Sequence, residues 1–160
     1  MTFDNSKTII GVRIKLFVAT VLFLVYLVMA YIAKWIPFPL LGMDDTAWTV
    51  IITVIYIVFL FYPMYLNYQY IYFSDDGYDI IFRYFNAGIA GGRKNSVEIN
   101  KTAFAGYKLE KKAFGLKQNL ILFQKMHDGI AKYPPIYISS LTDEERKKVF
   151  GALKRYAPEM

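Results

Sequence analysis

The sequence contains no cysteine and only one histidine among its 160 residues. The lack of cysteine excludes disulfide bonds, thiolate metal sites and cysteine nucleophiles. His127 lies in "KMHDG", a turn pattern, and has no second histidine at the spacing of a zinc site. No Gly-x-Ser-x-Gly segment marks a serine nucleophile either. The sequence therefore predicts no catalytic residue, no metal site and no cofactor, and an enzyme of unknown type is the least favoured of three function classes.

Charged side chains are missing from two long stretches in the first half of the chain. Leu16–Ala33 is an uncharged run of 18 residues, and Thr46–Ser74 is an uncharged run of 29 residues. Because a membrane-spanning helix needs about 20 apolar residues, we predict spans over residues 16–36 and 47–66. A signal peptide is the alternative for the first run, but that run exceeds the usual apolar core and a second one follows it. The prediction is a transmembrane hairpin over residues 15–67, after an N-terminal tail over residues 1–14.

The basic residues near the hairpin predict its orientation. Lys7, Arg13 and Lys15 precede the first run, whereas the loop carries Lys34 beside two aspartates. The positive-inside rule then places both termini in the cytoplasm. Neither predicted span holds an acidic or basic side chain, apart from Lys34 at the end of the first. This favours an anchor, or a docking surface for other helices, over a transport pathway.

The second half of the chain has the composition of a water-soluble domain, because residues 75–160 hold 25 of the 32 acidic and basic side chains. "YQYIYFS" and "YDIIFRYF" alternate as strands do, and "SDDG" between them is a turn signal. Four more short segments predict strands: "SVEI", "AFAGYKLE", "NLILFQK" and "IAKYPPIYIS", in which the two prolines belong at an edge, a strand start or a bulge.

The last segment predicts a helix with Ser140 or Thr142 as its N-cap and with Lys154 and Arg155 in its last turn. An apolar stripe at helical spacing would face the sheets. It is made of Val149, Phe150, Leu153 and Tyr156. The predicted fold class of this half is α+β, a small antiparallel β-barrel or sandwich capped by one C-terminal helix.

The order of these segments resembles the bacterial pleckstrin-homology-like (PH-like) membrane proteins. The resemblance is carried by "YQYIYFSDDGYDIIFRYFNAG", "RKNSVEINKTAFAGYKLEK", "FGLKQNLILFQ" and "PPIYISSLTDEERKKVFGALKRY", together with the hairpin. It implies a cytoplasmic PH-like domain over residues 68–160 and a multi-pass location in the bacterial inner membrane. Its motifs are hydrophobic patterns, which indicate a fold and not a particular function. The leading function class is a non-enzymatic, membrane-anchored accessory or scaffold module that binds a membrane or cytoplasmic protein partner.

Basic side chains supply the candidate contact residues, and the net charge of the chain is +6. They are Arg93, Lys94, Lys108, Lys111 and Lys112. These residues have two interpretations. Lysines near an anionic leaflet are attracted to it, and lysines in a solvated loop simply face water. "GIAGGRKNS" departs from the phosphate-binding loop because Arg93 follows its last glycine. No basic helix or RNA-binding signature is present, so nucleic acid is not an expected partner.

Three aspartates, Asp75, Asp76 and Asp79, gather in and just after the "SDDG" turn. They lack the regular spacing of a calcium loop, and we interpret them as a solvated, capping turn.

The expected partners follow from the junction between the two halves. The second span leads almost directly into the first strand, so the domain is held close to the lipid bilayer. A fixed height suits a partner in the same membrane, either another membrane protein or a second copy of this chain. Anionic lipid, sensed by the basic residues above, is the alternative partner.

Overall fold

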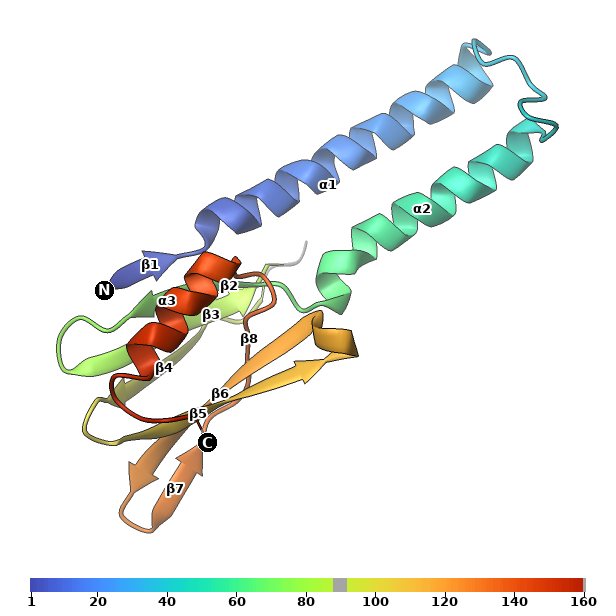
Figure 1. The fold of residues 1–160 in the computed structure, drawn as a ribbon. Coiled ribbons are helices and arrows are strands. Elements are labelled where there is room, and N and C mark those ends of the chain that lie inside the picture. Colours follow the sequence, from blue (N-terminus) through green and yellow to red (C-terminus); the bar gives the residue numbers. More distant parts are fainter. Residues whose placement is uncertain (88–91, 160) are drawn as a thin grey trace. The chain divides into compact units, whose positions relative to one another are not determined.

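A computed structural model describes residues 1–87 and 92–159 (Figure 1). The chain divides into two units, which we describe separately. One comprises residues 10–65, and the other comprises residues 1–9 and 66–160. The first is a helical hairpin and the second is an α+β domain.

The hairpin consists of two helices long enough and apolar enough to cross a membrane. Helix α1 spans Ser6–Leu27 and continues as a π-helical segment, Val28–Ile32, and helix α2 spans Asp45–Tyr65. No side chain of α2 is buried, as expected for a helix surrounded by lipid. The first helix begins at Ser6, ten residues before the predicted span, because lysine and arginine are good helix formers and do not end a helix.

Hydroxyl groups and aromatic rings join the two helices of the hairpin. The rings of Phe23 and Tyr56 stack at 4.5 Å, and the Tyr56 hydroxyl lies 3.0 Å from Thr20 Oγ1. Tyr26 and Tyr31 both reach the hydroxyl of Thr49, at 2.9 and 2.7 Å. These contacts satisfy side-chain hydroxyls that lipid could not satisfy.

The connection after the hairpin is short, as predicted. Helix α2 ends at Tyr65, and strand β2 (Gln69–Ser74) begins four residues later. Asn67 turns the chain with a φ of 51°, a left-handed conformation that asparagine tolerates better than most residues.

The first sheet has four antiparallel strands in the order β1-β2-β3-β4. Besides β2 these are β1 (Thr2–Asp4), β3 (Asp79–Asn86) and β4 (Asn95–Asn100). The β2–β3 hairpin confirms the prediction made from the "SDDG" turn, and Gly77 in that turn has a φ of 82°.

Strand β1 differs from the predicted N-terminal tail. It pairs with the edge of β2, with Thr2 opposite Ser74 and Asp4 opposite Tyr72. Three residues are too few to show an alternating pattern, so the neighbouring strand, and not local propensity, makes this segment a strand.

The second sheet contains β5 (Phe104–Lys112), β6 (Lys117–Met126) and β7 (Gly129–Lys132), and β8 (Ile136–Tyr137) pairs with the other edge of β6. A short 3-10 turn, Ala113–Gly115, joins β5 to β6. The two prolines lie between β7 and β8, where no ladder hydrogen bond is required of them.

Helix α3 (Asp143–Leu153) follows the strands, with Thr142 as its N-cap. Thr142 and Glu145 form a capping box, in which each side chain accepts a hydrogen bond from the other residue's backbone N–H. The helix ends at Leu153, so Lys154 is its C-cap and Arg155 lies beyond it, outside the last turn where both were expected.

One hydrophobic core joins both sheets and α3. The predicted stripe faces it, with Val149 and Leu153 fully buried and Phe150 partly buried, and Tyr156, which lies just beyond the end of α3, is also partly buried. The strands supply most of the remaining buried side chains, among them Ile71, Phe73, Ile80, Phe82, Val97, Ile99, Phe104, Tyr107, Leu120 and Leu122.

A buried polar node, formed by Asn5, Gln69 and Ser140, ties the start of the chain to this domain. Asn5 is fully buried, and its Nδ2 donates to the Gln69 carbonyl and to Ser140 Oγ, both at 3.0 Å. Its Oδ1 accepts from the Ile71 N–H at 2.8 Å, and Ser140 Oγ donates to the Gln69 carbonyl at 2.6 Å. The node fixes the N-terminal end of β2 against the loop before α3.

Candidate functional site

The outer face of the first sheet carries a groove of about 410 Å³. Strands β2 and β3 and the segment that enters β4 supply its walls. The lining residues are Tyr70, Tyr72, Arg83, Tyr84, Phe85, Lys94, Asn95 and Ser96. We call this the sheet groove.

Strand alternation places aromatic side chains in the sheet groove. On β2, Ile71 and Phe73 point into the core, so Tyr70 and Tyr72 point to the opposite face. Tyr70 pairs with Phe85 on β3, and their rings stack at 4.8 Å. A flat aromatic surface on a rigid sheet is therefore available for contact with another molecule.

Arginine and lysine add positive charge to that aromatic surface. Arg83 pairs with Tyr72 across the strands, and its guanidinium lies 5.9 Å from the Tyr72 ring centre. Arg83 also lies 3.7 Å from Glu98, but both side chains are more than half exposed, so water screens this pair. Lys94 is exposed at the end of the groove that leads into β4.

Burial shifts the pKa of two tyrosines that border the sheet groove. Partial burial, followed by the nearby Asp4 carboxylate, raises the pKa of Tyr70. Burial also raises the pKa of Tyr84. Tyr84 packs in the hydrophobic core and Tyr70 interacts with Asp4, so both phenols have partners within the fold.

Gly92 sets the course of the chain into the groove. A Cβ atom at this position would lie 2.7 Å from both the backbone nitrogen and the Cβ of Asn86. Any side chain would push the segment away from the end of β3. A glycine is therefore needed where the chain turns back toward Lys94.

The structure separates the five basic residues predicted as contacts. Lys94 lines the sheet groove and Arg93 directly precedes it, whereas Lys108, Lys111 and Lys112 lie on β5 in the second sheet. Residues 88–91 of the "GIAGGRKNS" stretch lie outside the described residues. No single cluster of all five basic residues forms among the elements that the structure describes.

Sequence reasoning missed the aromatic part of the sheet groove. Neither Tyr70 nor Arg83 was among the residues predicted as contacts. The signal lay in the residues that alternate with the core residues along β2 and β3. They place tyrosine, arginine and phenylalanine on the solvent-facing side of the sheet, and these residue types are enriched at protein interfaces.

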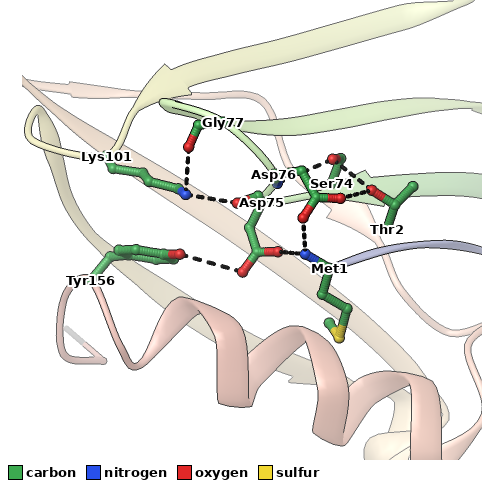
Figure 2. A network of polar contacts seen from close by, with 8 residues as sticks. All are labelled: Met1, Thr2, Ser74, Asp75, Asp76, Gly77, Lys101 and Tyr156. Atoms are coloured by element: carbon green, nitrogen blue, oxygen red, sulfur yellow. Dashed lines mark hydrogen bonds and ion pairs between the residues drawn. The ribbon is translucent and has the colours of Figure 1, made fainter.

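The acidic turn forms a network that fastens the N-terminus (Figure 2). The Met1 α-ammonium pairs with the carboxylates of both Asp75 and Asp76. Lys101 Nζ donates to the backbone carbonyls of Asp75 and Gly77, both at 2.7 Å. Thr2 Oγ1 donates to Asp76 at 2.5 Å, so this network holds β1 against the turn.

Hydrogen bonding shifts the pKa values within that network. Bonds to Asp75 and then Asp76 raise the pKa of the Met1 α-ammonium above its ordinary 8.0. The bond from that ammonium, and then the bond from Thr2, lower the pKa of Asp76 below its ordinary 3.8. The aspartates act as partners of the chain's own cation, and Asp79 accepts instead from Asn100.

Acidic and histidine side chains are the possible metal ligands in this chain, which has no cysteine. Among residues 1–87 and 92–159, no three acidic or histidine side chains gather in a way that could hold a metal ion. His127 is exposed in the turn between β6 and β7.

The sheet groove is therefore a hollow lined by aromatic and basic side chains on an α+β domain. Comparison of the chain with models of protein families, with curated proteins and with solved structures found no match.

Proposed function

We propose that this protein is a non-enzymatic, membrane-anchored binding module with a PH-like domain. The two helices anchor it in the inner membrane of a bacterium, with both termini in the cytoplasm. Two observations support the anchor: the helices are apolar, and almost none of their side chains is buried within the protein. Two antiparallel sheets closed by one C-terminal helix support the PH-like expectation.

The sheet groove is the observation that carries the binding function. Its occupant, in this proposal, is an acidic, extended segment of a partner protein. Arginine and tyrosine dominate the energetics of protein interfaces, and a carboxylate pairs well with a guanidinium. Arg83 and Lys94 lie at one face together with Tyr70 and Tyr72, so a segment that alternates acidic and aromatic side chains would match both features.

The free edge of the first sheet adds a second means of recognition. Strand β4 is the last strand in the sheet order, and within the described residues no strand pairs with its outer edge. An extended segment can add to such an edge through backbone hydrogen bonds. Asn95 and Ser96 begin β4 and also line the groove, so one segment could use the edge and the groove together.

The test is site-specific photo-crosslinking in cells that express the full chain. A benzoyl-phenylalanine replaces Tyr72 in the groove, and in a matched control it replaces Tyr78, which is 88% exposed in the β2–β3 turn outside the groove. We expect an adduct from the Tyr72 position whose crosslinked peptide is acidic, and we expect that Arg83→Glu abolishes it. An adduct with a second copy of this chain would identify a homo-oligomer as the partner.

Two results would contradict the proposal. One is equal crosslinking from the two positions. The other is an adduct that persists with the Arg83→Glu substitution. The substituted groove would repel an acidic segment, so a persisting adduct could not come from one.

A further inference from the structure

The turn between β5 and β6 presents two apolar side chains to solvent. Phe114 is fully exposed, at 109% of its reference area, and Leu116 is 55% exposed. We call residues 113–116 the apolar tip. Exposing phenylalanine so completely gains nothing for folding, because none of its surface is removed from water.

The backbone of the apolar tip is strained in a way that holds Phe114 outward. Three consecutive residues adopt left-handed conformations: Ala113 with φ 51°, Phe114 with φ 55° and Gly115 with φ 88°. Glycine adopts such angles freely, but a bulky residue such as phenylalanine rarely does. Strain of this kind persists where the position of a side chain matters for function.

Lysines flank the apolar tip. Lys111 and Lys112 precede it directly, and Lys108 lies on the same strand; all three are exposed. Within residues 1–87 and 92–159 none of these three ammonium groups has an ion-pair partner within 4 Å. The tip therefore combines an apolar point with a positively charged base.

We propose that the apolar tip docks on the anionic lipid surface of the membrane that holds the hairpin. Phe114 and Leu116 enter the boundary between headgroups and acyl chains, and Lys108, Lys111 and Lys112 contact lipid phosphates. Segments that combine exposed apolar residues with basic residues bind preferentially to anionic membrane interfaces. The inference rests on the proposed membrane anchor, which would raise the effective concentration of the tethered domain at the lipid surface.

The geometry of β6 supplies a matched control position. Its ten residues separate the β5–β6 turn from the β6–β7 turn by roughly 30 Å at the usual rise per residue, and the two turns lie at opposite ends of β6 (Figure 1). Ile130 is apolar and 57% exposed beside the β6–β7 turn. A tip docked on lipid at one end of β6 keeps Ile130 in water.

The experiment uses tryptophan as a depth probe in the full chain, in nanodiscs. Trp35 and Trp48 are first replaced by phenylalanine, and Phe114→Trp or Ile130→Trp then adds the single probe. Quenching by brominated lipid is compared in discs with and without phosphatidylglycerol. We expect strong quenching for Phe114→Trp in the anionic discs, weak quenching in purely zwitterionic discs and none for Ile130→Trp.

The lysines are tested in the same discs. Each lysine near an anionic leaflet contributes about a fivefold factor, so replacing Lys108, Lys111 and Lys112 by glutamine should weaken docking roughly 100-fold. Quenching that survives this triple substitution overturns the proposal, and so does equal quenching at the two probe positions. A chain that does not copurify with nanodiscs overturns the anchor and the docking together, whereas copurification with an unquenched tip overturns the docking alone.

Discussion

Replacing Asn5 by alanine should loosen the whole N-terminal end of β2. The substitution removes three side-chain hydrogen bonds, to the Gln69 carbonyl, to Ser140 Oγ and from the Ile71 N–H. The Gln69 carbonyl keeps its bond from Ser140, whereas the buried Ile71 N–H loses its side-chain acceptor. The second group therefore dominates the cost.

The size of the effect follows from these contacts. Leaving a buried N–H unsatisfied costs about 1–3 kcal/mol, and the two other bonds add about 1 kcal/mol together, because Ser140 retains a partner. We expect a loss of about 2–4 kcal/mol in the free energy of opening. That corresponds to amide exchange in β2 that is roughly 30- to 700-fold faster.

Hydrogen–deuterium exchange of the full chain in nanodiscs measures this directly, through peptides that cover Gln69–Ser74. The matched control is Asn95→Ala, because Asn95 is exposed and makes one long side-chain bond, at 3.4 Å. Its effect should stay within about 0.5 kcal/mol. Equal exchange in the two variants would show that the polar node contributes nothing to the stability of this sheet.

Three further predictions concern the clasp of β1, the cap of α3 and the wall of the groove. Hydrogen exchange of the β1 amides, corrected for intrinsic rates, should be slowest near neutral pH. The lowered pKa of Asp76 gives stability above about pH 4 that is lost at lower pH, and the raised pKa of the Met1 ammonium gives stability below pH 8 that is lost at higher pH. A profile that does not change with pH would contradict this. Thr142→Ala should destabilise α3 by about 1 kcal/mol, seen as faster exchange in α3 and not in β6; an unchanged helix would show that the capping box is dispensable. Gly92→Ala should weaken crosslinking from the Tyr72 position, because the added methyl group would lie 2.7 Å from Asn86 and displace the segment that lines the groove. Thermal unfolding of the core should change little. Undiminished crosslinking would show that this segment can accommodate the methyl group.

Strong local patterns made much of the fold predictable. The β2–β3 hairpin was predictable because apolar residues alternate along its strands with a period of two. The stripe of α3 was predictable because its apolar residues recur with the helical period of 3.6. The predicted span begins at residue 16 because counting apolar residues finds the part of a helix that suits lipid, whereas helix α1 begins at Ser6 and includes the basic residues before that part.

The polar node and the sheet groove were beyond sequence reasoning for a different reason. Asn5 meets Gln69 and Ser140 across long separations in the chain, and no local pattern announces such a meeting. Lys94 was singled out by its charge, but its grouping with Arg83 and Phe85 depends on strand register and on the turn at Gly92. Of the residues that line this site, only Lys94 was found from residue type.

The pairing of β1 with β2 has a consequence for how the protein is made. Strand β1 leaves the ribosome before the helical hairpin, and its partner β2 follows only after the entire hairpin. In a free chain, closing a loop of about 70 residues would cost on the order of 4 kcal/mol of entropy. Once α1 and α2 have paired, the two ends of that loop are already near each other, so most of this entropy has been lost before the sheet forms. Assembly of the hairpin should therefore be the slow, committing step, and completion of the first sheet should report that the two helices have paired.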